Sequence, residues 1–221
     1  MADTVKREMR WFLPGVVPPE THAWFESLAS DHAVAAYPRE DVYLIVPARD
    51  DLGPKVREGR FEIKIRDAQL DTPVVAAEHV IGIAEDWSKH KWRCSEEVRG
   101  LANVFDKGPR LRVAKYRRQR KFKIVDDRLD PVKLKSRHDV VFLVELTELH
   151  THFLDKKKTG SEPARGWTVA CEAVAPAEIV AHALELGATE IFANYNGPPL
   201  TPDMSFGYPH YAAEIANSQP Q

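Results

Sequence analysis

Polar and apolar residues alternate most regularly between Lys55 and Arg66, where the chain reads KVREGRFEIKIR. Successive side chains of an extended chain point to opposite faces. One face of this segment carries Arg60, Glu62, Lys64 and Arg66, and the other carries Phe61, Ile63 and Ile65; Lys55 and Arg57 precede it across a Glu-Gly turn. The pattern predicts a strand with one charged face, which suits an anionic ligand. A solvated face of an antiparallel sheet gives the same alternation, so both interpretations stand at this point.

Other segments have the length and composition of regular elements. Strands are predicted at Val5 to Leu13, Asp41 to Val46, Val74 to Ile83, Val140 to Leu149 and Trp167 to Ala173. Helices are predicted from Pro18 to near Ser30, from Ser95 through Phe105, and from Pro176 to Leu186 with Gly187 at the end. Trp87 and Trp92 are expected to bracket a polar turn.

A second basic segment runs from Arg110 to Ile124, RLRVAKYRRQRKFKI. As a strand it places Lys115, Arg117, Lys121 and Lys123 on one face and Tyr116, Arg118, Arg120 and Phe122 on the other. We expect Arg118 and Arg120 to lie in solvent. Such a stretch also suggests nucleic-acid binding, but proteins that bind single strands interleave aromatic residues with the cations, and here the aromatic residues fall opposite Lys115.

Carboxylates interrupt two of the apolar strands. Glu145 lies within VVFLVELTEL and requires a partner such as a lysine or a metal, because burying an unpaired charge is costly. Glu145 and Glu148 cannot share a face of a regular strand, so we place Glu145 inside, beside Thr147, and Glu148 outside. The following strand offers Glu172, with Thr168 and Ala170 on the same side.

The strands number about seven or eight, and several have a charged face. An antiparallel barrel gives these faces a common interior, whereas a sandwich would leave the charges in water. The predicted fold is therefore α+β: an antiparallel β-barrel, or tunnel, of about eight strands with helices packed outside. We expect a single domain over residues 1–221, in which 176–221 form a C-terminal helical extension whose aromatic residues pack onto the body.

Composition narrows the class of protein. The chain has 221 residues, of which 43% are hydrophobic and 29% charged, and a formal net charge of -2. It contains no apolar run long enough to span a bilayer and no signal-peptide pattern. With only Cys94 and Cys171, it is typical of a reduced, cytoplasmic protein. The favoured interpretation is that each cysteine is a small buried hydrophobe, and a disulfide between them is the alternative. An anion site must come from local clustering of cations, because the overall charge is close to zero.

Several charged motifs follow one another along the chain: Lys6-x-Glu8-x-Arg10, Asp41-x-Tyr43-Leu44, Lys55-x-Arg57, Glu62-x-Lys64, Lys115-x-Arg117, Glu145-x-Thr147 and then Glu172. In this order, and over roughly residues 5 to 175, they resemble the motifs of the CYTH superfamily, the triphosphate tunnel metalloenzymes. That family has Glu-x-Glu-x-Lys on its first strand, Arg-x-Arg and Lys-x-Arg motifs on later strands, and Glu-x-Glu near the end.

The resemblance implies an eight-stranded antiparallel tunnel that grips a triphosphate or polyphosphate. The phosphate-binding candidates are Lys6, Arg10, Lys55, Arg57, Arg60, Lys64, Arg66, Lys115 and Arg117. The resemblance also implies Mg²⁺ or Mn²⁺ as cofactor, with Glu8, Glu62, Glu145 and Glu172 as candidate ligands and Glu8, Glu145 and Glu172 as candidate catalytic residues. Such chemistry depends on charge neutralisation and positioning more than on covalent catalysis.

Three positions depart from the family pattern. Lys6 replaces the first glutamate, Arg10 the signature lysine, and Thr147 the second glutamate of the late pair. These changes reduce the capacity to bind metal, so two functions compete: metal-dependent hydrolysis of a triphosphate or polyphosphate, and non-catalytic binding of polyphosphate or a phosphorylated small molecule. Nucleic-acid binding through residues 110–123 is a weaker alternative. No membrane partner is expected, and the sequence makes no prediction of oligomeric state.

Overall fold

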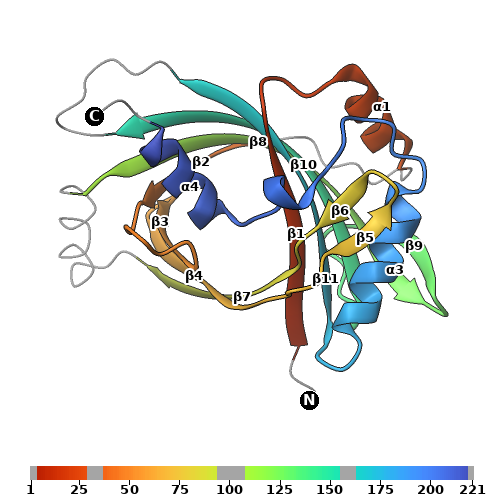
Figure 1. Ribbon diagram of the computed structural model, residues 1–221. Coiled ribbons are helices and arrows are strands. Elements are labelled where there is room, and N and C mark those ends of the chain that lie inside the picture. Colours follow the sequence, from red (N-terminus) through yellow and green to blue (C-terminus); the bar gives the residue numbers. More distant parts are fainter. Residues whose placement is uncertain (1–3, 29–36, 94–107, 155–162, 219–221) are drawn as a thin grey trace.

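The computed structural model describes residues 4–28, 37–93, 108–154 and 163–218. Eight strands pair edge to edge in a closed ring, and all pairings within it are antiparallel (Figure 1). The ring order is β10 (Val141–Leu154), β11 (Ala164–Pro176), β1 (Thr4–Pro14), β7 (Glu85–Arg93), β4 (Arg60–Gln69), β3 (Leu52–Arg57), β2 (Tyr37–Leu44) and β8 (Arg110–Val125), which pairs back with β10. The predicted antiparallel arrangement of about eight strands is confirmed.

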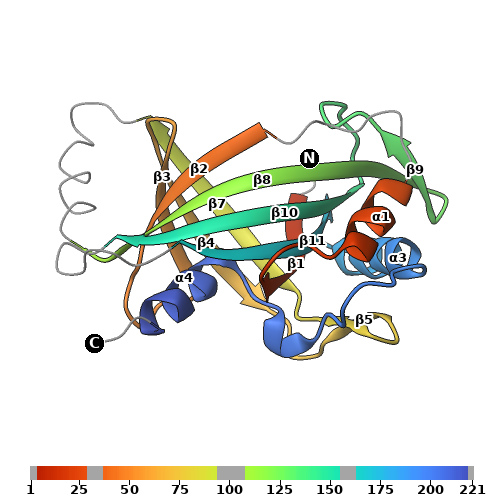
Figure 2. The same cartoon turned by 90° about the horizontal axis from the view of Figure 1, so that it is seen from above.

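The remaining elements lie outside the ring. Strand β9 (Arg128–Val132) pairs with β8, and β5 (Val74–Ala77) forms a separate hairpin with β6 (Val80–Gly82). Figure 2 shows helices α1 (Pro19–Ser27) and α3 (Val180–Phe192) on one side of the ring, whereas α4 (Tyr208–Asn217), which follows the short helix η2 (Pro202–Met204), lies across one of its ends. No helix within the described ranges has the length and apolar character needed to cross a membrane.

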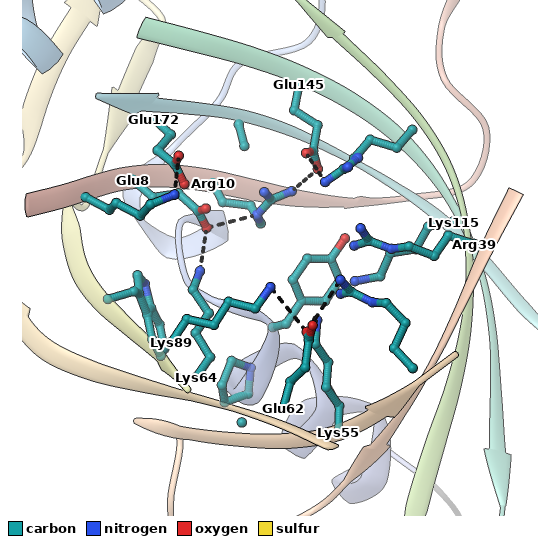
Figure 3. A pocket seen from close by; sticks show the side chains of 18 of the residues that line it. Glu8, Arg10, Arg39, Lys55, Glu62, Lys64, Lys89, Lys115, Glu145 and Glu172 are labelled. Atoms are coloured by element: carbon teal, nitrogen blue, oxygen red, sulfur yellow. Dashed lines mark hydrogen bonds and ion pairs between the residues drawn. The ribbon is translucent and has the colours of Figure 1, made fainter. Parts of the chain in front are cut away.

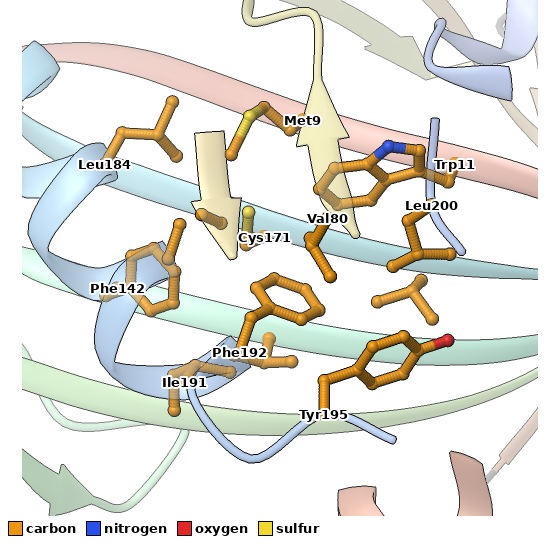
Figure 4. Close-up of a cluster of buried hydrophobic side chains, with 14 of the residues drawn as sticks. Met9, Trp11, Val80, Phe142, Cys171, Leu184, Ile191, Phe192, Tyr195 and Leu200 are labelled. Atoms are coloured by element: carbon orange, nitrogen blue, oxygen red, sulfur yellow. The ribbon is translucent and has the colours of Figure 1, made fainter. Parts of the chain in front are cut away.

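Alternation along each strand separates a charged interior from an apolar exterior. On β1, Glu8 and Arg10 point into the ring, while Met9 and Trp11, which alternate with them, point outward and are fully buried. The outward residues of β1, β10 and β11 pack against α3, α1 and the β5–β6 hairpin (Figure 4). Cys171 belongs to this layer as a buried free thiol, as predicted for a small hydrophobe. The main hydrophobic core therefore lies outside the ring.

A second apolar cluster fills one end of the ring. It contains Phe12, Tyr43, Ile45, Leu111, Val113, Leu149, Phe153 and Ala212, with Phe206, Tyr208 and Tyr211 packed against it. These residues come from the end of β1, the end of β2, the start of β8, the end of β10 and helix α4. We call this set the closing cluster, because α4 and the segment before it lie over this end of the ring (Figures 1 and 2).

Two predictions about the segment from 74 to 93 were wrong. Residues Val74 to Ile83 form the β5–β6 hairpin instead of one strand, because a turn interrupts the apolar run at Glu78 and His79. Trp87 and Trp92 both lie within β7 and do not bracket a turn. The polar residues between them belong to the strand, which pairs with β4 along its whole length.

The third predicted helix was also misplaced. Helix α3 begins at Val180 and continues to Phe192, so Gly187 lies inside it and does not end it. Glycine is required there by packing, because a Cβ at this position would overlap the ring of Phe142. The helix predicted from Ser95 through Phe105 lies outside the described residues.

Arg118 and Arg120 are not solvated as expected. Arg120 is buried and donates to the Glu26 carboxylate on α1 at 2.8 Å, with its guanidinium 4.9 Å from the Phe25 ring centroid. Arg118 is half-buried. Its Nη1 donates to the other Glu26 oxygen at 3.2 Å, and its Nη2 lies 2.6 Å from His22 Nδ1. These outward arginines attach α1 to the ring.

Candidate anion-binding cavity

The ring encloses a cavity of about 340 Å³. Four acidic side chains line it, Glu8, Glu62, Glu145 and Glu172, and nine basic ones, Lys6, Arg10, Arg39, Lys55, Arg57, Lys64, Lys89, Lys115 and Arg117 (Figure 3). Every strand of the ring contributes at least one lining residue. The lining of the cavity therefore carries an excess of positive charge, although the net charge of the whole chain is close to zero.

Arg10 connects two of the carboxylates. Its Nε lies 3.1 Å from Glu8 Oε1, and its Nη1 lies 3.0 Å from Glu145 Oε1 and 2.9 Å from Thr168 Oγ1. Burial would raise the pKa of Glu8, but Lys64 and Arg10 outweigh it and lower that pKa to about 2. Both glutamates therefore stay ionised, and the guanidinium occupies the space between them.

Thr147 and Gln119 complete the surroundings of Glu145. Thr147 Oγ1 donates to Oε1 at 2.9 Å, and Gln119 Nε2 donates to Oε2 at 3.1 Å. Arg117 approaches Oε2 at 3.4 Å. Glu145 faces inward beside Thr147, as predicted, and its partners are arginines, a threonine and a glutamine. Glu148 points outward, where it lies 3.7 Å from Arg118.

Asp41 organises the opposite wall. Its carboxylate is fully buried. Arg57 Nε lies 2.5 Å from Oδ1, and the Nζ atoms of Lys115 and Lys55 lie 3.0 Å and 3.1 Å from Oδ2. Burial lowers the pKa of Lys55 to about 7 even though Asp41 opposes the shift, and burial likewise holds the pKa of Lys115 well below its usual range. Lys55 therefore titrates near neutral pH, unlike a surface lysine.

Glu62 lies across the cavity from Glu145 (Figure 3). Its Oε2 is surrounded by Lys89 at 3.2 Å, Arg57 at 3.4 Å and Lys55 at 3.6 Å. Burial would raise the pKa of Glu62, but the nearby cations outweigh it and lower the pKa. This glutamate belongs to a cationic cluster on β3, β4 and β7 and not to the group around Arg10.

Glu172 lies in a part of the cavity that is open to solvent. Lys6 Nζ is 3.4 Å from its Oε1, and the Lys6 side chain is 56% exposed. In the register of β1 and β11, Glu8 is directly opposite Glu172. Like charges in that arrangement are destabilising unless a cation compensates them.

Cations cover the aromatic rings of the cavity. Lys115 Nζ lies 3.3 Å from the Tyr208 ring centroid and 5.0 Å from that of Tyr43, and Lys64 Nζ lies 4.6 Å from that of Trp87. Such contacts stabilise a cation through the electron-rich face of the ring. The aromatic faces thus support the cationic lining.

The structure brings together most of the residues that the sequence singled out. All four glutamates and seven of the nine basic candidates line the cavity; the two that do not are Arg60 and Arg66. Arg60 is exposed next to the β3–β4 turn. Arg66 instead contacts Glu85 at 2.9 Å and Asp50 at 3.0 Å.

The sequence reasoning missed other lining residues, among them Arg39, Lys89, Gln119, Trp87 and Tyr208. Trp87 and Lys89 share a face of β7, a signal that was lost when this segment was interpreted as a turn. Arg39 precedes the predicted start of β2. Tyr208 comes from a helix far along the chain, and no local pattern connects it with the strands.

No protein-family profile matches the sequence, and no curated protein is significantly similar to it. Among solved structures, a conserved hypothetical protein from Pyrococcus furiosus has a TM-score of 0.42 at 11% identity, over 90% of this chain and 94% of that one. A putative adenylyl cyclase from Hippeastrum, described as having a dominant triphosphatase activity, has a TM-score of 0.41 at 12% identity, over 97% and 98%. A protein from Pyrococcus horikoshii has a TM-score of 0.35 at 17% identity, over 81% of this chain and 90% of that one. These similarities are too low to assign a family or an activity. The structure itself shows a closed antiparallel ring with a charged interior, as the sequence predicted.

Proposed function

We propose that the cavity binds a triphosphate, a polyphosphate or a similarly phosphorylated small molecule directly through its basic side chains. The observation that carries the proposal is the lining of nine basic and four acidic residues around one cavity. Multiply charged phosphate groups match such a lining, because charge-assisted hydrogen bonds strengthen where water is excluded.

Some of these cations are more available to a ligand than others. The ion pairs of Lys6, Lys64 and Arg117 with glutamates are all 3.4 Å long. Their side chains are also partly exposed, whereas the closest contacts to Asp41 are shorter and lie at its buried carboxylate. We infer that Lys6, Lys64 and Arg117 turn from glutamate to phosphate oxygens, while the Asp41 cluster holds the wall in place.

The four glutamates do not fit a shared metal site. Glu62 lies among Lys55, Arg57 and Lys89, and Arg10 fills the space between Glu8 and Glu145. Within the described residues, no group of three or more His, Cys, Asp or Glu side chains is arranged to hold a metal ion. A divalent cation between Glu8 and Glu145 would have to lie beside the Arg10 guanidinium, which already pairs with both carboxylates and would repel it. We therefore assign the neutralisation of the ligand to Lys and Arg.

Titration calorimetry with tripolyphosphate in the presence of a chelator tests this function. We expect binding to persist without divalent metal, and the ligand to raise the melting temperature, because it binds only the folded state. Lys64→Ala should weaken binding about tenfold or more, since it removes a charge-assisted contact. Arg128→Ala, an exposed cation on β9 outside the cavity, is the matched control. Equal losses in the two variants would indicate nonspecific attraction and contradict the proposal.

Metal-dependent hydrolysis is the second candidate, and the Glu8–Glu172 pairing favours it. Mg²⁺ is commonly held by one or two carboxylates together with substrate phosphates, and these two residues supply that donor chemistry. Phosphate release from tripolyphosphate with Mg²⁺ or Mn²⁺ is the test. If the chain is a hydrolase, Glu172→Gln should reduce release by about 100-fold or more, and the outward Glu148→Gln should not. If neither metal supports phosphate release while tripolyphosphate still stabilises the protein, the hydrolase candidate is contradicted and binding without hydrolysis is the remaining function.

A further inference from the structure

Within the part of the chain that the structure describes, the cavity opens at the end of the ring where Lys6 lies, and we call this opening the mouth. The exposed fraction of the lining side chains falls from 56% at Lys6 to 2% at Lys115, and it reaches 0% at Asp41 behind the wall. Along β1 the inward residues run from Lys6 at the mouth through Glu8 and Arg10 to Phe12 in the closing cluster. Depth in the cavity therefore follows the direction of β1.

The inner end is closed by packed side chains. On β8 the inward residue beyond Lys115 is Val113, and on β10 the inward residue beyond Thr147 is Leu149; both are buried in the closing cluster. Helix α4 adds Tyr208 and Pro209 to the cavity lining. Its contact with β3 is close, since a Cβ at Gly53 would lie 2.9 Å from Pro209 Cγ.

Aromatic stacking holds this closure together. The Phe12 ring lies 4.5 Å from that of Tyr211 and 5.2 Å from that of Phe206, with nearly parallel planes in both pairs. Tyr208 stacks on Tyr43 at 5.6 Å. Contacts of this kind contribute beyond the area that they bury, so the closing cluster is part of the folded core.

The floor of the cavity carries an unused donor. The hydroxyl oxygen of Tyr208 is buried, and no hydrogen-bond partner for it lies within the described residues. Burial raises the pKa of Tyr208, which keeps its proton available for donation. A buried polar group without a partner is costly, and a ligand oxygen would satisfy it.

We propose that the cavity recognises the end of a linear phosphate chain. The terminal phosphate lies at the inner end, beside Tyr208, Lys115 and Arg10, and the following phosphates lead back past Arg117 and Lys64 to the mouth at Lys6. The interior of a long chain cannot occupy this path, because a chain that enters and leaves would require a second opening. This inference rests on the proposed binding of phosphorylated anions.

A linear chain has two ends, whatever its length. Stoichiometry by calorimetry and by sedimentation, with linear polyphosphates of several defined lengths in chelator, therefore tests the inference. We expect one protein per tripolyphosphate, and two per chain at every length that accommodates a protein at each end. A number of proteins that rises in proportion to chain length would overturn end recognition and leave the proposed binding intact. Failure of all phosphates to bind would overturn both.

A conservative variant tests where the terminal phosphate lies. Tyr208→Phe keeps the ring in the closing cluster and removes the unpaired hydroxyl, so we expect about tenfold weaker binding with the stoichiometry unchanged. Tyr211→Phe is the matched control, because Tyr211 lies on the same helix and in the same cluster but does not line the cavity. Unchanged affinity in Tyr208→Phe, or equal losses in both variants, would overturn the placement of the terminal phosphate at the inner end.

Discussion

On the inner face of β8, Lys115 and Arg117 contact carboxylates around the cavity, whereas on the outer face Arg118 and Arg120 hold helix α1 against the ring. The two pairs lie within six residues of one another and are indistinguishable by charge. Their partners differ. Asp41 is fully buried, while the Glu26 side chain is 54% exposed. Equal charge in a sequence can therefore signal a ligand site on one face of a strand and a packing contact on the other.

The largest difference should appear when the acidic partners are neutralised. Asp41→Asn leaves Lys55, Arg57 and Lys115 without their buried counter-charge, which should cost about 3 to 5 kcal/mol of unfolding free energy. Glu26→Gln removes a largely solvated partner and should cost less than about 1 kcal/mol. Urea unfolding of both variants under identical conditions measures the two losses, and similar values would remove the distinction between the two faces.

The two arginines next to one another on β8 should differ in ligand binding. Arg117→Ala should weaken tripolyphosphate binding by about 1.5 to 3 kcal/mol, because it removes a charge-assisted contact inside the cavity. Arg118→Ala removes the same formal charge from the outer face and should leave the affinity nearly unchanged. Titration calorimetry at two ionic strengths gives the comparison. A matching loss in Arg118→Ala would show that only the general field of the protein attracts the ligand.

Proton uptake should also be confined to the inner wall. The pKa of Lys55 is about 7, so this lysine is protonated below neutral pH and largely neutral above it. A bound phosphate raises that pKa; binding should therefore take up protons above pH 7, and the affinity should fall by up to about tenfold per pH unit in this range. The charged and titratable groups that act on Lys55 come from β2, β3, β4, β7 and β8: Arg39, Asp41, Tyr43, Arg57, Glu62, Lys89 and Lys115.

Calorimetry in buffers of different ionisation enthalpy measures this uptake. Lys55→Met should take up fewer protons than the wild-type protein, and Arg118→Ala should take up the same number. Uptake that is identical in Lys55→Met would assign the protons to another group, such as Lys115 or the ligand itself.

The smallest effect concerns the outer arginine. Arg120→Ala removes the contacts with Glu26 and Phe25 and should lower the unfolding free energy by about 1 kcal/mol. Tripolyphosphate affinity should stay at the wild-type value. Chemical unfolding and calorimetry on one preparation test both statements, and a lower affinity at full stability would contradict the assignment of Arg120 to packing.

The alternation of side chains made the inner wall predictable. Strict parity placed Glu8 and Arg10 together on β1 and separated Glu145 from Glu148 on β10, and the structure has the same facing. Parity works here because each of these strands has one face toward a charged cavity and the other toward an apolar layer or solvent. The closed ring followed from the need to give several charged faces one interior.

Long-range packing was not predictable in the same way. Tyr208 reaches the cavity because α4 folds back over the end of the ring, and nothing near residue 208 in the sequence indicates this. The role of Arg120 depends on α1, about a hundred residues earlier in the chain. Asp41 organises one wall only because β2 lies beside β3 and β8. Such relations follow from the register of pairing, which a single strand does not encode.

The close contact between Gly187 and Phe142 limits which substitutions this fold can accept. Helix α3 lies so close to β10 that the Phe142 ring occupies the place of a side chain at position 187. Neither position can therefore vary freely while the other is fixed. In a library randomised at both positions and selected for folded protein, large residues at 142 should recur only with glycine at 187, and larger residues at 187 only with small ones at 142. The two positions would then register as a covarying pair, although neither contacts the cavity.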